Sequence, residues 1–446
     1  MNQIIIAKFG GTSMATAGSI KQSAKVAVAN EVSVVVVSAT AGTTDLLVEL
    51  AAAVLANKHQ KAEETILAIN KKHATLAKQL DSPKSCLNYQ QELLRSLRDI
   101  CQSSTVSGNL ALTDEIYSFG ERLSANLIAP LIKSSELVDA RDLIKTDDHF
   151  GNATPEIKQI GSQARKIVLP LIAKGKVVIT QGFIGSSPDN MTTTLGRGGS
   201  DYTASLLAEA LGANQMQIWT DTAGIASADP RIISSAQQIE QLSFQEAAEL
   251  ATAGAKILFP KTILPARRSK IPVFVGSTFH PQDGGTLITS ETAHKPLIKA
   301  IALKTNQSLV SISTPEMAHQ PGYLAKIFTI FAEHKISIDQ VSTSEITVSI
   351  IVEDKISSHG KLIDSLRELG EVKVEKGLSV ISLIGNQVNN APGLTRDIFH
   401  TIEAEGDKIA IRMICQGASR HNFCFVVADK YGVSIVEQLH KEFIDL

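Results

Sequence analysis

Residues 192–203 have the sequence TTTLGRGGSDYT and lie between a predicted strand and a predicted helix. An apolar run ending at Thr180 precedes them, and residues 204–212 follow with helical spacing and a closing glycine. Three glycines and several hydroxyls in such a loop allow backbone amides to converge on an anion, and the helix start adds its positive dipole end. Arg197 contributes a planar donor fork that suits a carboxylate or a phosphate. The stretch therefore predicts an anion-binding loop in an α/β protein.

The plainer alternative for this stretch is an ordinary connection in which Ser200 or Asp201 caps the following helix. The ends of the other predicted strands weigh against it. Loops that contain glycine, hydroxyl or acidic residues follow five strand ends, at Phe9, Val37, Thr180, Thr220 and Val275. Open parallel sheets bind ligands at the carboxyl ends of their strands, so these loops predict one crevice for a small, strongly anionic ligand.

The composition is that of a globular protein with a large core. The chain has 446 residues, 43% of them hydrophobic and 20% charged, which is enough for two or three domains. A formal net charge of -2 gives no global field that would favour nucleic acid or an anionic membrane. The four cysteines lack metal-ligand spacing, which favours reduced thiols. With neither a signal-peptide pattern nor a membrane-spanning apolar stretch, the sequence predicts a cytoplasmic protein.

The first two thirds of the sequence alternate between predicted strands and helices, which predicts a mainly parallel sheet with helices on both faces. Four consecutive valines in the predicted strand Val32–Ser38 fit a sheet that is covered on both sides. Residues 45–104 are predicted to be helical with a solvated, charged face. The sequence contains no Walker motif and no convincing G-x-G-x-x-G at the start of a βαβ unit, which argues against a dinucleotide enzyme.

The last third of the sequence contains a repeat. PGYLAKIF at residues 321–328 recurs as PGLTRDIF at residues 392–399, each after a β-rich run and before a helix and more β-rich sequence. This pattern predicts a βαββ module that occurs twice, with a Pro-Gly turn opening its first helix. The two copies would pack together or pair across subunits through sheet edges. A plain dimerisation module is the alternative to a ligand-binding role.

Two further motifs contain charged residues beside apolar ones. Lys8 lies just before Gly10 and Gly11, where the backbone can approach a ligand and the ammonium would neutralise phosphate charge; a surface lysine at a tight turn is the alternative. Glu121 and Arg122 lie on a predicted helix with apolar flanks. They form either a surface ion pair or a pair that faces a site.

Taken together, these motifs resemble those of the aspartate kinases. The resemblance covers the whole chain and rests on five stretches: KFGGTS at 8–13, SFGER at 118–122, GRGGSD at 196–201, WTD at 219–221 with ADPR at 228–231, and GAK at 254–256. It implies an amino-acid-kinase fold of the carbamate-kinase type, a three-layer αβα sandwich with a mainly parallel central sheet, followed by two α+β ACT-type domains. The second half resembles the lysine-sensitive, monofunctional class in three stretches, residues 319–324, 336–339 and 343–345.

The domain boundaries implied by the resemblance are 1–293 for the catalytic domain, 305–376 for the first ACT-like domain and 377–446 for the second. A strand from residues 296–304 is assigned either to the connection or to the second ACT-like domain. The resemblance also implies a homo-oligomer formed through the ACT-like domains, without nucleic acid or membrane as a partner.

The reaction implied by the resemblance is ATP-dependent phosphorylation of the β-carboxylate of L-aspartate to 4-phospho-L-aspartate, the first step toward lysine, threonine and methionine. Joining two anions requires charge neutralisation and alignment rather than a covalent nucleophile. ATP would carry Mg2+ on its phosphate oxygens, so a dedicated metal cage is not expected. The implied catalytic residues are Lys8, Gly10, Gly11 and Asp201. Aspartate would be bound by Ser38, Thr44, Glu121, Arg197 and Ser200, and ATP by Lys8, Gly10, Thr220, Asp221, Arg231 and Lys256.

L-Lysine is the implied feedback inhibitor. The resemblance places it near Met317, Gln320, Tyr323, Leu324, Ser337, Ile338 and Asp339. Asp339 would accept the lysine ammonium; a loop acid without a ligand is the alternative. Three positions depart from the family pattern: Met14 replaces a common valine, Ala226 a common tyrosine and Phe259 a common histidine. The last two put the nucleotide contacts in question.

Two other functions are compatible with parts of the sequence. A kinase for another small acidic amino acid could use the same fold, but the SFGER motif and the double ACT-like tail argue against it. A catalytically silent amino-acid sensor is the second possibility. The presence of Lys8, Arg197, Asp201 and Lys256 argues against that one.

Overall fold

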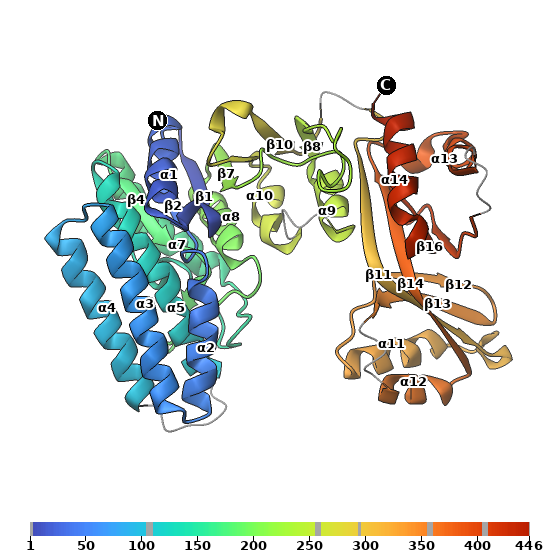
Figure 1. The fold of residues 1–446 in the computed structure, drawn as a ribbon, viewed down its shortest axis with the longest axis horizontal. Helices are drawn as coiled ribbons and strands as arrows, with labels where there is room; N and C mark the ends of the chain where they lie inside the picture. Colours follow the sequence, from blue (N-terminus) through green and yellow to red (C-terminus); the bar gives the residue numbers. More distant parts are fainter. Residues whose placement is uncertain are drawn as a thin grey trace. The chain divides into compact units, whose positions relative to one another are not determined.

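The computed structural model describes residues 3–103, 110–254, 260–292, 296–354, 360–403 and 409–445. The chain divides into two compact units (Figure 1). Unit 1 comprises Met1–Ile225, Gln238–Phe244 and Ile257–Ala293. Unit 2 comprises Ala226–Gln237, Gln245–Lys256 and His294–Leu446, so two short segments from the first part of the sequence belong to it.

Unit 1 is built on an eight-stranded sheet with the order β3-β4-β2-β1-β7-β9-β10-β8. All neighbouring strands are parallel except the antiparallel pair β9–β10, which confirms the predicted mainly parallel sheet. A separate hairpin pairs β5 with β6. The strands are β1 (Ile5–Phe9), β2 (Val34–Val37), β3 (Ser135–Leu137), β4 (Val177–Gln181), β5 (Ile184–Ser186), β6 (Thr192–Thr194), β7 (Gln215–Thr220), β8 (Gln241–Ser243), β9 (Val273–Ser277) and β10 (Gly285–Thr289).

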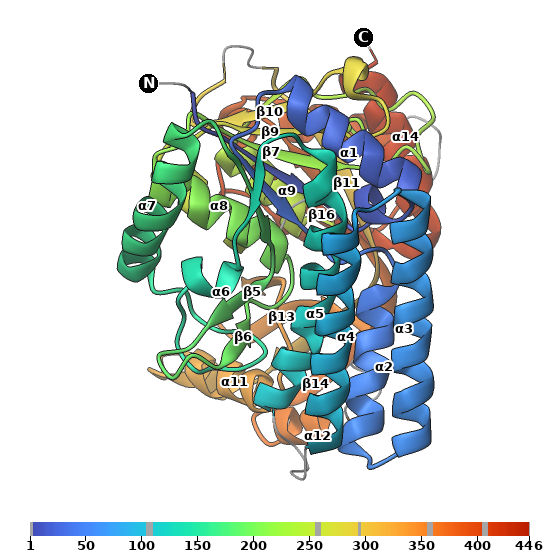
Figure 2. The ribbon, with the colours of Figure 1, turned by 90° about the vertical axis from the view of Figure 1, so that its left-hand side faces the viewer.

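Helices cover both faces of this sheet (Figure 2). The four valines of β2 are fully buried, as expected for a strand with apolar neighbours on both sides. On one face α1, α3 and α5 share an apolar core with β1, β2 and β4, while α7 and α8 pack against β1, β2, β4 and β7. The helices of this unit are α1 (Ala17–Ala29), α2 (Thr43–Leu55), α3 (His59–Gln79), α4 (Lys84–Ser103), α5 (Leu110–Ile128), α6 (Ala140–Leu143), α7 (Ile157–Ala173), α8 (Gly199–Leu211) and α10 (Leu264–Arg268).

The helical region predicted for residues 45–104 forms the three helices α2, α3 and α4, which run side by side (Figure 2). Their apolar faces share a second core with α5, built around Leu50, Ile69, Leu97 and Phe119. The charged residues of these helices remain on the outside, as the sequence predicts for a solvated face.

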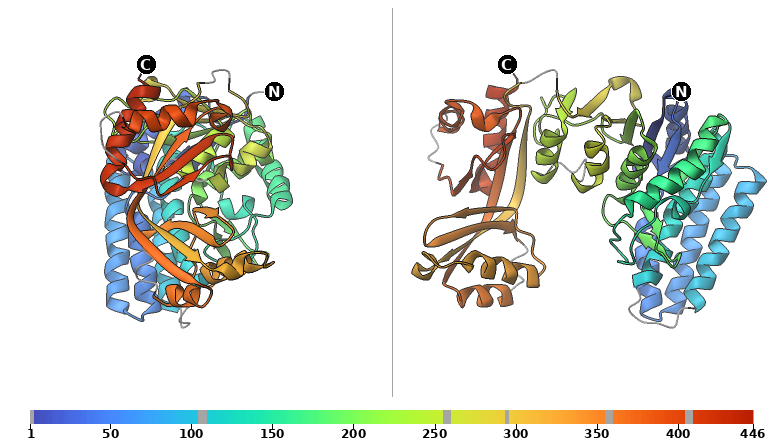
Figure 3. Two further views of the ribbon diagram at one scale, coloured as in Figure 1. Left: turned by 90° about the vertical axis from the view of Figure 1, so that its right-hand side faces the viewer. Right: turned by 180° about the vertical axis from the view of Figure 1, so that it is seen from behind.

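Unit 2 contains one six-stranded antiparallel sheet with the order β12-β13-β11-β14-β16-β15 (Figure 3). The predicted repeat is visible in its elements: β11-α11-β12-β13-α12 is followed by β14-α13-β15-β16-α14. The strands are β11 (Ala300–Ser313), β12 (Gln340–Thr343), β13 (Thr347–Glu353), β14 (Glu371–Ile384), β15 (Met413–Cys415) and β16 (Asn422–Ala428). The helices are α9 (Phe244–Thr252), which begins at the edge of unit 1, α11 (Tyr323–Glu333), α12 (Gly360–Arg367), α13 (Leu394–Glu403) and α14 (Asp429–Phe443).

The two modules of unit 2 share their long central strands. Residues 307–313 of β11 pair with β13 of the first module, whereas residues 300–304 pair with residues 380–384 of β14, which belongs to the second. Each module keeps its own apolar core. The core of the second module also includes Ala228 and Ile233 from the short segment Ala226–Gln237.

The structure differs from the sequence prediction in two local details. Thr192–Thr194 form strand β6 rather than a loop, because they pair with β5. Helix α8 begins one residue after Gly198, whose φ is 74° and which makes no side-chain cap, so the prediction that Ser200 or Asp201 caps the helix is wrong. Both residues instead lie in the first turn of α8. Among the helices that the structure describes, none is both long and apolar enough to cross a membrane.

Candidate functional site

The carboxyl ends of five strands in unit 1 lie at one edge of the sheet, because β1, β2, β4, β7 and β9 are parallel neighbours. The loops after these strands are the ones that the sequence singled out. Parallel sheets bind ligands at this edge.

Lys8 and Asp201 form an ion pair at this edge. The Nζ of Lys8, in β1, lies 2.8 Å from the Oδ1 of Asp201, in the first turn of α8, and the two side chains are only 12% and 11% exposed. The alternative of a surface lysine is therefore wrong. A Cβ at Gly10 would lie 3.5 Å from the Lys8 Nζ, so the Gly10 turn lies next to the ammonium. The pair places a cation beside the amino end of a helix, where an anionic ligand is stabilised.

Glu121 is buried in α5 and points at the loop after β2. Its Oε1 accepts a hydrogen bond of 3.1 Å from the backbone N–H of Ala39. Burial raises the pKa of Glu121 to about 8, although the Ala39 N–H acts in the opposite direction. The neighbouring Gly120 is required here because a Cβ would lie 2.9 Å from the Cβ of Ala39. Glu121 is thus a desolvated acid beside a strand end rather than half of a surface ion pair.

Arg122 points away from this carboxylate. Its guanidinium lies 3.6 Å from Glu115 and 4.5 Å above the ring of Phe119, in a partly buried group of charges that also contains Arg141 and Asp139. Burial lowers the pKa of Arg122. The interactions of Arg122 therefore stabilise the packing of α5 and do not involve Glu121.

The stretch that contains Arg197 is held by an acid from α5. Asp114 accepts hydrogen bonds of 2.8 Å from the N–H and the hydroxyl of Thr194 and from the N–H of Gly151. Gly196 has a φ of 73°, and a Cβ there would lie 2.7 Å from the Oδ1 of Asn152. Arg197 itself is exposed, which suits a residue that receives a ligand from solvent.

Ser200 and Phe183 lie where the loop after β4 meets the start of α8. A Cβ at Gly182 would lie 2.5 Å from the Cβ of Ser200, so these two segments touch through a glycine. Phe183 has a φ of 72°, which is unusual for a bulky residue and costs on the order of 1–3 kcal/mol. Its N–H is fixed by the hydroxyl of Thr203 at 3.0 Å. Such strain collects at functional sites, and no sequence pattern predicts a positive φ at a phenylalanine.

The predicted nucleotide residues are divided between the two units. Thr220 and Asp221 end β7 in unit 1, where the Thr220 hydroxyl donates to the Asp221 carboxylate at 2.9 Å. Arg231 belongs to unit 2, is largely exposed and pairs with Asp229 through two nitrogens, the shorter contact being 2.6 Å. Lys256 and Phe259 lie outside the described residues.

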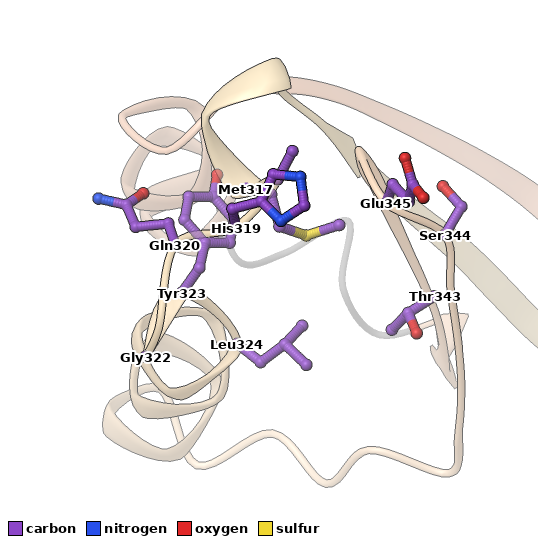
Figure 4. Close-up of a pocket in the computed structure, with 10 residues that line it drawn as sticks. Met317, His319, Gln320, Gly322, Tyr323, Leu324, Thr343, Ser344 and Glu345 are labelled. Carbon is purple, nitrogen blue, oxygen red and sulfur yellow. The ribbon is translucent and has the colours of Figure 1, made fainter.

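The predicted effector residues form two groups in unit 2. Met317, Gln320, Tyr323 and Leu324 line a cavity of 350 Å³ in the first module (Figure 4). Ser337, Ile338 and Asp339 are absent from the residues that line it. They precede β12, and the Asp339 carboxylate lies 2.5 Å from the Nζ of Lys304.

The opposite wall of the cavity is formed by residues that the list of expected effector contacts did not contain. Thr343, Ser344 and Glu345, at the far end of β12, face the turn before α11 (Figure 4). Glu345 gives the cavity an exposed carboxylate. The sequence did contain a signal for Glu345, because residues 343–345 form one of the stretches that resemble the lysine-sensitive class.

No group of three or more His, Cys, Asp or Glu side chains that could hold a metal ion occurs in the part of the chain that the structure describes. The donors described so far are the Lys8 ammonium at the sheet edge, the exposed Arg197 of the connection after β6 and the Ser200 hydroxyl at the start of α8. Such a set fits the phosphate and carboxylate groups of ligands better than it fits a bare cation.

Comparisons with known protein families agree with this fold. The model of the amino acid kinase family matches residues 3–277, and that of the ACT domain matches residues 310–359 and 381–443. These matches and the sheet edge define an amino acid kinase with a C-terminal ACT region.

The relatives narrow the class further. The chain is 40% identical over 457 residues to lysine-sensitive aspartokinase 3 of Escherichia coli, with all of both chains covered. It matches the crystal structure of E. coli aspartokinase III with aspartate and ADP at a TM-score of 0.84 and 40% identity, covering 98% of this chain and 99% of that one. The T-state structure of the same enzyme with lysine and aspartate matches at a TM-score of 0.85 and 40% identity, covering 99% and 100%. The chain belongs to the aspartokinase family, as the sequence motifs predicted.

Proposed function

We propose that this protein transfers the γ-phosphoryl group of ATP to the β-carboxylate of L-aspartate, forming 4-phospho-L-aspartate and ADP. The family supports this reaction, since the E. coli relative has been crystallised with aspartate and ADP. The single observation that carries the proposal is the desolvated Lys8–Asp201 pair beside the Gly10 turn, at the ligand-binding edge of the sheet. This product would begin the synthesis of lysine, threonine and methionine.

The reaction joins two anions, and the chain's residues serve to neutralise and align them. A carboxylate is already a nucleophile at neutral pH, so no general base is needed. An oxygen of the β-carboxylate attacks the γ-phosphorus, and the bond from that phosphorus to the bridging oxygen of ADP breaks. Lys8 and the amides of Gly10 and Gly11 hold the transferring group while Asp201 fixes the Lys8 ammonium.

Aspartate is held by residues from three segments of unit 1, namely the connection from β2 into α2, helix α5 and the connection into α8. Arg197 takes one carboxylate through two nitrogens, with Ser38, Thr44 and Ser200 as further donors. Glu121 accepts the substrate ammonium. Because the pKa of Glu121 is about 8 without that partner, the carboxyl is mostly protonated at neutral pH and ionises as the ammonium arrives.

ATP is held by Lys8, Gly10, Thr220, Asp221, Arg231 and Lys256, and its phosphate oxygens carry Mg2+. Mg2+ bound together with ATP would neutralise part of the phosphate charge. Arg231 already has a carboxylate partner in Asp229. A nucleotide that binds Arg231 would therefore either replace Asp229 as its partner or share the guanidinium with it.

Regulation by L-lysine is assigned to the first module of unit 2. The cavity between the turn before α11 and the end of β12 supports this, because 350 Å³ is large enough for an amino acid. The proposed contacts are Met317, Gln320, Tyr323, Leu324, Ser337, Ile338 and Asp339, to which the cavity adds Glu345 as an acid for an ammonium.

The remaining proposals concern organisation. Residues 1–293 would act as the catalytic domain, and 305–376 and 377–446 as the two regulatory domains. Homo-oligomers would form through the latter, which present β12 and β15 as the two edge strands of their sheet. Four cysteines without a disulfide support a reducing, cytoplasmic location.

The function is tested by incubating the purified protein with MgATP and aspartate and trapping the acyl phosphate as a hydroxamate. We expect product with aspartate and inhibition on titration with lysine, but not with threonine or methionine. Product with glutamate and none with aspartate would overturn the substrate assignment. Arg197→Ala should raise the KM for aspartate, because it removes a proposed carboxylate contact. Separately, light scattering of the purified protein should show an oligomer.

A further inference from the structure

The substrate loop, defined as residues Ser38–Thr44, comprises the connection after β2 and the first two residues of α2; it carries two of the proposed aspartate contacts and is contacted by α3 from one side. We propose that Lys72 and His73 of α3 are positioning residues that hold this substrate loop in the shape needed to bind aspartate. The inference rests on the proposed function, which places Ser38 and Thr44 at the substrate. Neither Lys72 nor His73 was among the residues that the sequence motifs indicated.

His73 anchors the middle of the loop through a chain of hydroxyls. Its side chain is fully buried, and its Nδ1 lies 2.9 Å from the carbonyl of Ile69, so this nitrogen carries the proton. The Nε2 is then an acceptor and lies 3.4 Å from the Thr40 hydroxyl, which is 2.6 Å from the hydroxyl of Thr43. In the tautomer that satisfies every group, Thr43 donates to Thr40 and Thr40 donates to His73.

The environment keeps His73 in that neutral form. Burial and the nearby Lys72 lower the pKa of His73 to about 4, so Nε2 remains an acceptor at neutral pH. The same Thr40 closes the turn on the backbone side, because its carbonyl accepts the N–H of Thr43 at 2.9 Å. Thr40 is therefore fixed by both its side chain and its main chain.

Lys72 holds the next residue of the loop. Its ammonium donates to the carbonyl of Ala41. Gly42 follows with a φ of 74° and serves as the N-cap position of α2, and a Cβ there would lie 3.6 Å from the Lys72 Nζ. A charged donor on a carbonyl next to a left-handed turn fixes where α2 begins, and Thr44 lies in the first turn of that helix.

The other side of the loop is held by β1 and α5. The N–H of Ser38 donates to the carbonyl of Phe9 at 3.1 Å, and the N–H of Ala39 donates to Glu121. Among the described residues, α2 contacts Thr40 through Thr43, and α3 adds the contacts of His73 to Thr40 and of Lys72 to Ala41. Without α3, Ser38 would keep its anchor, whereas the path from Thr40 to Thr44 would lose two of its fixed points.

Lys72 is not needed to hold α3 in place, and this makes the inference testable. The apolar side of α3, with Ala62, Ile66 and Ile69, is buried in the core shared with α2, α4 and α5. Lys72 is only half-buried. Replacing its ammonium should therefore change the loop before it changes the fold.

The test compares Lys72→Met, Thr40→Val and Thr40→Ser with the wild-type enzyme, using Lys71→Met as a matched control because Lys71 is exposed on the same helix. We measure the KM for aspartate, the KM for ATP, kcat and the denaturant midpoint. Lys72→Met should raise the KM for aspartate about tenfold, since hydrogen bonds to charged groups are the stronger ones. Thr40→Val should raise it about threefold, Thr40→Ser should restore it, and the KM for ATP should stay within about twofold.

Two outcomes would overturn the inference. Lys72→Met and Thr40→Val could leave the KM for aspartate unchanged, or they could raise both KM values together with a lowered midpoint, as a general loss of structure would. Ser38→Ala and Thr44→Val test the proposed function separately. If these two leave aspartate binding unchanged, the substrate assignment of the loop is wrong. If they weaken it while the α3 variants do not, only the role of α3 is wrong.

Discussion

The proposed phosphoryl-transfer edge of unit 1 and the proposed effector cavity of unit 2 differ in the exposure of their charged side chains. Lys8 and Asp201 are about one tenth exposed, and Glu121 is 6% exposed. Glu345, which lines the cavity, is exposed, and the pair Lys304–Asp339, which belongs to the same unit but does not line the cavity, is 23% and 31% exposed. A desolvated site interacts strongly with a developing charge and needs little reorganisation. An exposed site exchanges partners easily, which suits a ligand that must leave when its concentration falls.

The largest effect should follow from breaking the buried pair of unit 1. Lys8→Met removes the cation from the phosphate position and leaves Asp201 without its partner at 2.8 Å. We expect kcat to fall on the order of 10³-fold, as for the loss of one preorganised donor to a developing anion. The hydroxamate assay measures this. Lys25→Met, on the exposed face of α1, is the control and should retain full activity.

Glu121 offers the next test, because a buried acid should release a proton when its ligand binds. Its pKa of about 8 leaves it mostly protonated at pH 7, and a substrate ammonium would lower that value. Aspartate binding should therefore release close to one proton, seen as a binding enthalpy that changes with the ionisation enthalpy of the buffer. Glu121→Gln should abolish that dependence and raise the KM for aspartate by about 10-fold or more. Wild-type binding without proton release would contradict the assignment.

His73 should make unit 1 sensitive to acid. Its folded pKa of about 4 lies below the unfolded value near 6.5, so the unfolded chain binds more protons between these values. The stability that neutral His73 provides is present above pH 6.5 and is lost as the pH falls toward 4, by about 2 kcal/mol at pH 5. His73→Gln should remove this component, so the difference in unfolding free energy between variant and wild type should change between pH 7.5 and pH 5. Parallel pH profiles for the two proteins would contradict it.

Sequence patterns predicted what depends on periodicity and on local composition. The buried valines of β2, the strand ends and the repeated module all followed from such patterns, whereas the roles of Lys8 and Glu121 came from the family resemblance. The contacts of α3 could not be predicted, because Thr40 and His73 are 33 residues apart and meet only when the helices pack. The positive φ of Phe183 and the separation of Asp339 from the cavity also depend on tertiary packing. Local sequence patterns therefore predicted where the loops at the strand ends lie, whereas the residues that hold these loops in place are determined by tertiary packing.

The smallest effect is expected at the exposed pair of unit 2. Lys304 lies where the pairing of β11 with β14 becomes irregular, and its ammonium lies 2.5 Å from Asp339. Because both side chains are partly exposed, Lys304→Met should change the unfolding free energy by no more than about 1 kcal/mol.

Lys299→Met, in the same unit, provides the contrast, since Lys299 and Glu246 form a pair with 2% and 1% exposure. Removing that ammonium leaves a buried carboxylate and should cost about 3 kcal/mol or more. The unfolding free energies of both variants are measured by denaturant unfolding. Equal losses for Lys304→Met and Lys299→Met would contradict the prediction that the buried pair contributes more to stability than the exposed one.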